Sequence, residues 1–201
     1  AVSKLKADLK SGKSAREVIL SEAEQVAAKS LGLLTAKPIL ISLNTDEDKL
    51  KDAALYEERF ATDLGVGKSQ VVAICAKTEM ELASLNGDEQ EEYLRDLGVE
   101  ESGLERLIQR AFTTLGLLTF LTAGEKEVRA WTIHKDMAAQ AAAGVIHSDF
   151  ATKFIKADVV PYSTFVEVGG WKKAREEGKV RSEGKNYQVQ DGDVVEFKIG
   201  A

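Results

Sequence analysis

The chain has 201 residues, of which 44% are hydrophobic and 30% are charged, a balance typical of folded globular proteins. Its single cysteine excludes an internal disulfide and a thiolate zinc cluster, and no apolar run is long enough to span a membrane. We therefore expect a cytoplasmic protein that has no membrane contact.

The charge of the chain is distributed unevenly. The net charge is -6, and the first 120 residues hold all of the excess, with 21 acidic and 15 basic residues against 12 of each in the remainder. Such asymmetry indicates two units with different partners. A short basic segment in the neutral part is the candidate surface for an anionic ligand, although a solvated helix face would have the same composition. Its basic residues are Lys172, Lys173, Arg175, Lys179, Arg181 and Lys185.

Two short helices are predicted at the start of the chain. Apolar positions over residues 3–32 have helical spacing, and Ser11-Gly12 interrupts it. Ser21 and Glu24 form the S-x-x-E capping box that marks the beginning of a helix, because each side chain can bond the backbone N–H of the other.

A strand–helix–strand pattern follows. Continuous apolar runs over 39–43 and 71–75 predict strands that are buried on both faces, as in a parallel sheet. A polar helix over 47–61 connects them, which makes a βαβ unit and places this part of the chain in the α/β class. The inward-facing residues of that helix are expected to be Leu50, Ala54 and Leu55. Two further helices are expected over 88–97 and 103–115.

The pattern changes near residue 118, where a small mixed β/α unit of about 80 residues is predicted. Asp191-Gly192 between alternating apolar residues predicts a terminal hairpin, because glycine adopts positive φ at no steric cost. The other expected elements are a strand over 126–133, a helix over 137–143, a strand over 155–160 and a helix over 165–177. In the first of these strands Val128, Ala130 and either Trp131 or Thr132 are expected near one face.

Gly-Lys-Ser occurs twice, at 12–14 and 67–69, and neither copy is expected to bind phosphate. A phosphate-binding loop follows a buried strand and contains several glycines, whose backbone N–H groups converge on the phosphate. The first copy follows an amphipathic helix, and the second precedes a strand. We predict no catalytic residue and no metal ligand in this chain.

Two loops carry the more informative signal, because each follows a predicted buried strand, where α/β sheets place their ligands. Asn44 to Glu47 has the form N-x-x-E and resembles the guanine-reading N-K-x-D of GTPases, with the Lys and the Asp replaced. An asparagine amide can donate to N7 and accept from N6 of adenine. Cys75 to Lys77 resembles the S-A-K signature of the same enzymes. A polar strand-to-helix turn is the alternative interpretation of the first loop.

Long stretches of the sequence are similar to the C-terminal part of the YchF/Obg-like ATPase family. They include LLTAKPILISLNTDED, LGVEESGLERLIQRAF, TFLTAGEKEVRAWTI, AAGVIHSDFATKFIKADVV and EGKNYQVQDGDVVEFKI, which together cover most of the chain from Leu33 onward. The resemblance implies a partial P-loop-type G domain followed by a ubiquitin-like β-grasp TGS domain. The implied domains are a helical arm over 1–32, the rear of the nucleotide-binding domain over 33–118 and the TGS domain over 119–201.

The resemblance also implies a function. Asn44, Thr45 through its backbone, and Glu47 would read adenine, with Cys75, Ala76 and Lys77 beside them. The full-length protein would then bind and hydrolyse ATP with Mg²⁺, dock on the ribosome or ribosomal RNA, and act as a monomer. The family's phosphate-binding loop and Mg²⁺ ligands have no counterpart in these 201 residues, so this chain alone is expected to be inactive. The alternative is a non-catalytic adaptor that binds the ribosome or RNA through its helical arm and TGS domain.

Overall fold

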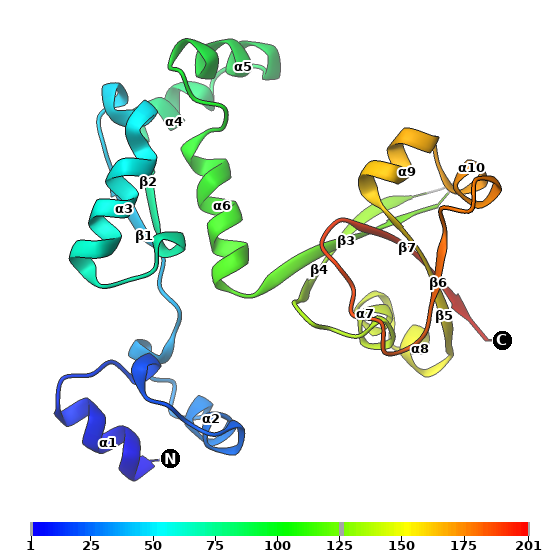
Figure 1. Ribbon diagram of the computed structural model, residues 1–201, viewed down its shortest axis with the longest axis horizontal. Coiled ribbons are helices and arrows are strands. Elements are labelled where there is room, and N and C mark those ends of the chain that lie inside the picture. The colour runs from blue at the N-terminus through cyan, green and yellow to red at the C-terminus, as the bar shows by residue number, and fades with distance from the viewer. Residues whose placement is uncertain (1, 125–126, 201) are drawn as a thin grey trace. The chain divides into compact units, whose positions relative to one another are not determined.

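The computed structural model describes residues 2–124 and 127–200, and the chain divides into two compact units, Ala1–Thr114 and Leu115–Ala201 (Figure 1). Both units combine helices with strands, so the α/β fold class expected from the sequence is confirmed. None of the helices in these described ranges is long and apolar enough to cross a membrane.

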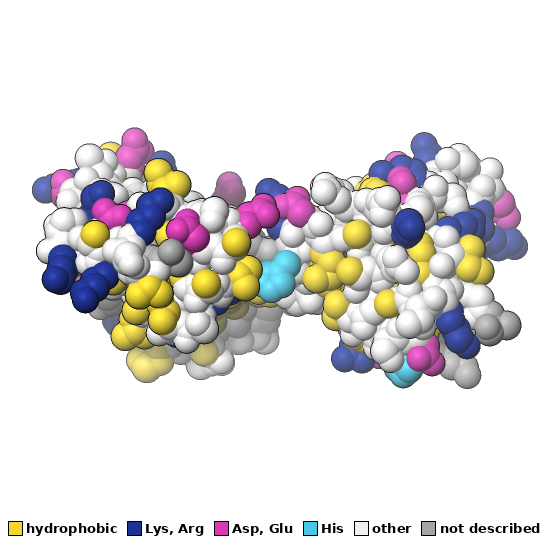
Figure 2. All heavy atoms as spheres, turned by 90° about the horizontal axis from the view of Figure 1, so that it is seen from below, with side chains coloured by type: hydrophobic (Ala, Val, Ile, Leu, Met, Phe, Trp, Pro, Cys, Tyr) yellow, Lys and Arg dark blue, Asp and Glu magenta, His cyan; other side chains and the backbone are white. Residues whose placement is uncertain are grey.

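The first unit begins with a small helical arm. Its first helix ends before Gly12, as predicted, and Gly12 has a φ of 89°, a conformation that favours glycine. The predicted capping box is present, because the Glu24 N–H donates to Ser21 Oγ and the Ser21 N–H donates to the Glu24 carboxylate at 3.0 Å. Apolar side chains gather on the surface of the arm (Figure 2). Its helices are α1 (Val2–Lys10) and α2 (Glu22–Lys29), with 3-10 turns at Ala15–Glu17 and Leu34–Ala36.

Two parallel strands, β1 (Ile41–Asn44) and β2 (Val71–Ile74), form the sheet of the first unit. Their pairing confirms the predicted βαβ unit, but only β2 is almost entirely buried. In β1, Ser42 and Asn44 are exposed. Among the described strands β1 pairs with β2 alone, and a strand at the edge of a two-stranded sheet lacks the neighbours that would cover it. The expectation that β1 is buried on both faces is therefore wrong.

The connection between these strands is a 3-10 helix, Glu47–Asp52, followed by α3 (Ala53–Leu64). Leu50 faces inward as predicted, whereas Ala54 and Leu55 are exposed, so the predicted inward face is wrong by one position. The buried face of α3 consists of residues spaced four apart, namely Ala53, Glu57 and Ala61. A pattern based on hydrophobicity misses this face because its central residue is a glutamate.

Glu57 is the central polar contact of the first unit, and its side chain is 1% exposed. One carboxylate oxygen accepts the Ala73 N–H at 3.0 Å and pairs with the Arg106 guanidinium, and the other pairs with Arg110 at 3.1 Å. Arg110 also donates to the Lys68 carbonyl at 2.7 Å. One carboxylate therefore joins α3, β2 and the helix that carries both arginines.

Three helices complete the unit: α4 (Ala76–Leu82), α5 (Gly87–Asp96) and α6 (Gly103–Thr114). The last two confirm the prediction, and α4 was not predicted. At the start of α6 the Gly103 N–H donates to Glu79 of α4 at 2.7 Å. A Cβ on Gly103 would lie 2.8 Å from a side-chain carbon of Ile74, so only glycine allows this approach of α6 to β2 and α4.

The second unit is a five-stranded sheet with the order β4-β3-β7-β5-β6. Its central pair, β3 and β7, is parallel, with Leu121 opposite Val194, and the other pairs are antiparallel. Helix α7 (Ala139–Ile146) packs through Ala139 and Ala142 against a core that includes Phe120 and Val159. This order, with a helix between the two hairpin-like pairs, is the β-grasp topology. The strands are β3 (Leu117–Ala123), β4 (Val128–His134), β5 (Phe154–Pro161), β6 (Arg181–Glu183) and β7 (Asp193–Ile199).

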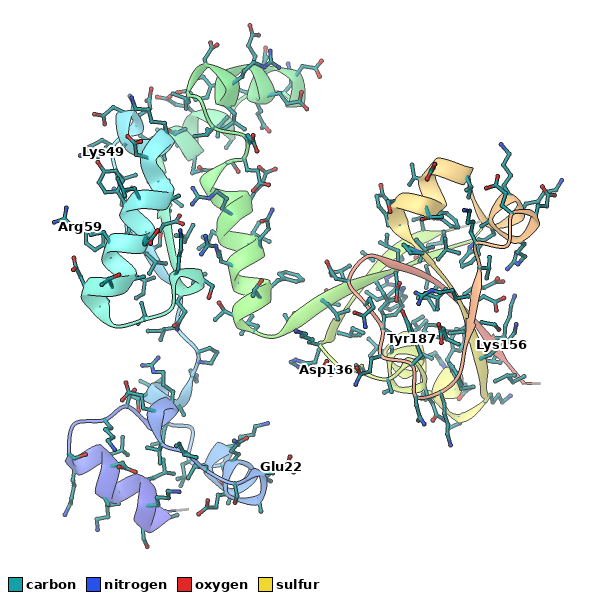
Figure 3. All side chains as sticks on the ribbon, in the orientation of Figure 1. Glu22, Lys49, Arg59, Asp136, Lys156 and Tyr187 are labelled. Carbon is teal, nitrogen blue, oxygen red and sulfur yellow. The ribbon has the colours of Figure 1, made fainter. Side chains whose placement is uncertain are left out.

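The predicted terminal hairpin is wrong. Asp191-Gly192 does turn, with a Gly192 φ of 74°, but β7 pairs with β3 and β5 instead of with the segment before the turn. That segment bonds residues 137–139 instead, since Ala139 donates to the Tyr187 carbonyl at 2.7 Å. The hydroxyl of Tyr187, which Figure 3 labels, donates to the buried Asp193 carboxylate at 2.6 Å. Burial and this hydrogen bond raise the pKa of Tyr187 to about 12.

Other predicted elements of the second unit need smaller corrections. The single helix expected over 165–177 is two helices, α9 (Tyr162–Val168) and α10 (Trp171–Glu176), because Gly169 and Gly170 both have positive φ. In β4 the residues that face the core are Ile133 and Trp131, the latter being one of the two alternatives expected, whereas Val128 and Ala130 are exposed, contrary to expectation. Lys126 of the strand expected over 126–133 lies outside the described residues, and a short helix, α8 (Ser148–Thr152), precedes β5.

Glu57→Gln tests the central ion pairs of the first unit. Removing one partner leaves the charges of Arg106 and Arg110 without their carboxylate, which costs about 3–5 kcal/mol in buried pairs. We expect a loss of that order in the free energy of unfolding, measured by urea denaturation. The neighbouring Glu58 is exposed and pairs with Lys68 at 3.1 Å, so Glu58→Gln should cost no more than about 1 kcal/mol. Equal losses for the two variants would contradict the assignment.

Candidate functional site

A cleft of about 730 Å³ lies at the carboxyl ends of β1 and β2. Five of the six residues predicted from the two loops line it: Asn44, Thr45, Glu47, Cys75 and Lys77. The remaining lining residues were not predicted, and they are Asp46, Asp48, Lys51, Asp96 and Leu97. The parallel pairing brings the two loops to the same edge of the sheet, as the strand order of the βαβ unit requires.

Two hydrogen bonds join the loops directly. The Ala76 N–H donates to Asn44 Oδ1 at 3.1 Å, and the Thr45 N–H donates to the Ile74 carbonyl at 2.8 Å. The first bond fixes the orientation of the Asn44 amide, so its Nδ2 group is the one left to donate to a ligand. Because an amide oxygen has two lone pairs, Oδ1 can also accept a second hydrogen bond.

Glu47 is the first residue of its 3-10 helix, and a chain of polar contacts connects it with α4 and α5. Lys77 Nζ lies 3.8 Å from the Glu47 carboxylate and 3.7 Å from that of Glu81. The Tyr93 hydroxyl donates to Glu81 at 2.5 Å, and this bond is the main reason that the pKa of Tyr93 is raised to about 12. The carboxylate at the end of the N-x-x-E sequence is therefore flanked by a lysine.

Asp46, between Thr45 and Glu47, forms an ion pair with Lys49. Lys49, which Figure 3 labels, donates to Asp46 Oδ2 at 2.6 Å. This bond lowers the pKa of the Asp46 carboxyl and raises the pKa of Lys49. The cleft stays acidic, since Glu47, Asp48 and Asp96 line it together with two lysines. Such a lining suits the hydrogen-bond donors of a neutral base better than the charge of phosphates.

Cys75 is 4% exposed and precedes the first residue of α4. A thiol that is buried in this way is not accessible as a free nucleophile. Among the residues that the structure describes, no group of three or more His, Cys, Asp or Glu side chains could hold a metal ion.

The six basic residues of the second unit do not share one helix. Lys172, Lys173 and Arg175 belong to α10, Arg181 belongs to β6, and Lys179 and Lys185 lie in the connections. Arg175 pairs with Glu196 and lies 3.9 Å from Asp158, whereas Arg181 pairs with Glu183 at 3.5 Å and Asp193 at 3.6 Å. The four lysines have no carboxylate partner in the described part of the chain.

Trp171 precedes these lysines and is a core residue. Its Nε1 donates to the Ala123 carbonyl at 2.8 Å, and its ring meets the edge of Phe165 with the centroids 5.1 Å apart. The Trp171 ring therefore contributes to the packing of its own unit.

Comparison with known proteins places the chain in a family. The family model named YchF-GTPase_C, described as a protein of unknown function (DUF933), matches residues 117–200. A "Ribosome-binding ATPase YchF" of Bacillus subtilis (strain 168) is 47% identical over 98% of this chain and 55% of that relative. The relative of the same name from Haemophilus influenzae (strain ATCC 51907 / DSM 11121 / KW20 / Rd) is 44% identical over 92% of this chain and 50% of its own length.

The solved structure of the Schizosaccharomyces pombe YchF GTPase superposes on 98% of this chain with a TM-score of 0.81 and 28% identity. This chain belongs to the YchF/Obg-like family. It spans about half the length of the YchF relatives that it matches, and 53% of the S. pombe YchF structure. The two bacterial YchF proteins are named as ATPases and the S. pombe YchF as a GTPase, so the names differ in the nucleotide.

Asn44→Ala tests whether the Asn44 amide holds the two loops of the YchF cleft together. The variant removes the acceptor of the Ala76 N–H, and a hydrogen bond of this kind contributes about 1 kcal/mol. We expect hydrogen exchange at the Ala76 amide, measured by NMR, to become about five times faster. Asn44→Asp keeps an acceptor oxygen and should leave the exchange rate close to that of the wild type. Unchanged exchange in Asn44→Ala would contradict the contact.

Proposed function

We propose that this chain is the C-terminal, base-recognising part of a ribosome-associated ATPase of the cytoplasm. The observation that carries the proposal is the Asn44–Ala76 hydrogen bond of 3.1 Å, which joins both predicted base-reading loops at one cleft. A cleft at the carboxyl ends of parallel strands is the usual place for a nucleotide in α/β sheets. The bacterial relatives named as ribosome-binding ATPases agree with this assignment.

Adenine fits the donors and acceptors of the cleft. The Asn44 Nδ2 group would donate to N7, and Oδ1 would accept from the N6 amino group with its second lone pair. The Glu47 carboxylate would accept from the same edge of the base, with Lys77 limiting its movement and Thr45 and Ala76 contributing backbone contacts. The phosphates and their Mg²⁺ would lie outside these contacts, and ATP binding by this chain alone is expected to be weak.

A non-catalytic adaptor is the competing function. Such a protein would bind the ribosome or RNA through its arm and its β-grasp unit, and its cleft would be only a polar turn. The contact of Asn44 with a second loop favours the nucleotide function, because a simple turn needs no bond to a strand exit 32 residues away.

The nucleotide function predicts a preference for ATP over GTP in a full-length protein that contains this chain. Replacing Asn44 by Ala should weaken ATP binding, measured by calorimetry, by about 5- to 150-fold, the effect of losing 1–3 kcal/mol of base recognition. Glu47→Asp should shift the preference only part of the way toward GTP, because Thr45 still stands where GTPases carry the lysine of N-K-x-D. Asp63→Asn, on the exposed part of α3, is the control and should change nothing. Equal affinities of the wild type for ATP and GTP would exclude adenine reading.

The ribosome is the proposed partner of the second unit. Lys172, Lys173, Lys179 and Lys185 are the basic residues of the segment whose charges are not matched by a described carboxylate, so they are suited to phosphate. Arg175 and Arg181 are paired within the unit, and we propose that they hold its fold more than they bind RNA. The unit is neutral as a whole, so docking should require a shaped ribosomal site instead of any RNA duplex.

Reversing Lys172 and Lys173 to Glu tests this surface. Each lost phosphate contact lowers the slope of binding against salt by about 1, so the double variant should weaken co-sedimentation with ribosomes and reduce the slope by about 2. The matched control is Lys135→Glu with Lys153→Glu, two exposed lysines of the same unit outside the segment. An unchanged salt series in the first variant, or an equal loss in the control, would remove this surface from the proposal.

A further inference from the structure

The acidic charge of the chain is concentrated in one short region. Residues 76–114 contain ten Asp or Glu and four Lys or Arg, an excess equal to the net charge of -6 of the whole chain. Two of those four basic residues, Arg106 and Arg110, pair with Glu57. Helices α4, α5 and α6 therefore carry a negative surface with little basic charge left to compensate it.

A groove of about 590 Å³ opens in this acidic region. Its lining residues come from all three helices, which Figure 1 labels. Apolar side chains form part of it, and one of them, Leu104, is 52% exposed although it lines a groove. Glutamates stand beside the leucines. The groove residues that the proposal uses are Leu82, Leu94, Leu104, Glu91 and Glu100.

The shape of the groove is held by bonds between the helices. The Gln90 side-chain amide of α5 donates to the Leu82 carbonyl at 2.9 Å and to the Leu85 carbonyl at 3.1 Å. Tyr93 of α5 donates to Glu81 of α4, and the Gly103 N–H of α6 donates to Glu79 of α4. The groove is thus preformed, and a ligand would not have to order it.

Apart from Glu101, which accepts a hydrogen bond from the Gln109 side-chain amide at 3.3 Å, the glutamates of the groove divide into two groups. Glu79 and Glu105 accept backbone N–H groups of Gly103 at 2.7 Å and Ser102 at 2.9 Å, and these bonds fix the start of α6. Glu91 and Glu100 are exposed and have no hydrogen-bond or ion-pair partner in the described part of the chain. The second group provides negative charge at the groove that the fold itself does not use.

We propose that this groove, which we call the acidic groove, binds a lysine- or arginine-rich amphipathic segment of a protein partner. The leucines of the groove would receive one apolar side chain or two, and Glu91 and Glu100 would pair with the basic residues that flank them. A nucleic acid would be repelled by the same carboxylates. The proposal concerns a different surface from the cleft and the lysines of the second unit, and it does not depend on the function proposed for either.

The test is a fluorescence-anisotropy titration of the 201-residue chain with a labelled helical peptide of lysine and leucine. Its leucines are placed at i, i+3, i+4 and i+7 on one face, and a scrambled peptide of equal composition is the reference. We expect the amphipathic peptide to bind more tightly than the scrambled one. Glu91→Lys with Glu100→Lys should weaken its binding about ten-fold, because two attractions become repulsions.

A matched control separates the acidic groove from general charge. Asp63→Lys with Glu92→Lys makes the same change in net charge at exposed positions outside the groove, and it should have a much smaller effect. Leu104→Ser should reduce binding of the amphipathic peptide about ten-fold and leave the scrambled peptide unaffected, because only the former buries a leucine there.

Three results would overturn the proposal. The first is equal binding of the two peptides, and the second is an equal loss in the groove and control variants. The third is a concentration-dependent dimer in sedimentation that the peptide dissociates, since a second copy of the chain would then be the occupant.

Discussion

A single buried carboxylate holds the first unit together. The apolar pattern of α3 predicts a different buried face, yet the Glu57 carboxylate of this helix accepts hydrogen bonds from two guanidinium groups of α6 and from one backbone N–H of β2. A two-stranded sheet is too small to be stable by itself, so the position of β2, and with it the exit loop at Cys75, depends on the helices on either side. The cleft is therefore supported by an interaction that does not touch it.

The parts of the fold that follow from local chemistry could be predicted from the sequence. The capping box at Ser21 and the glycine break at Gly12 are of this kind, as are the apolar runs that located β1 and β2. The errors arose where a distant partner decides. The buried face of α3 includes Glu57, because Arg106 and Arg110 compensate the charge of its carboxylate. The segment before Asp191 bonds residues 137–139 instead of β7. No local pattern contains either contact.

The same distinction applies to the candidate site. Asn44 and Glu47 were found because a strand end followed by N-x-x-E has a recognisable form, whereas Asp96 and Leu97 reach the cleft from the end of α5. Nothing near them in the sequence signals that position. Counting basic residues also gave a surface of six, of which the structure commits Arg175 and Arg181 to carboxylates of their own unit. Composition records charge but not the partner that neutralises it.

The position of β7 at the centre of its sheet has a consequence for folding. The first strand of the unit, β3, makes its parallel contact only with the last, through Leu121 and Val194. Without β7 the sheet would separate into the pairs β3–β4 and β5–β6, and isolated two-stranded sheets are at best marginally stable. The loop-closure entropy must be overcome before this contact forms, so the unit should assemble slowly and in one cooperative step. A chain whose synthesis has not yet reached β7 would therefore have no stable, partly formed sheet.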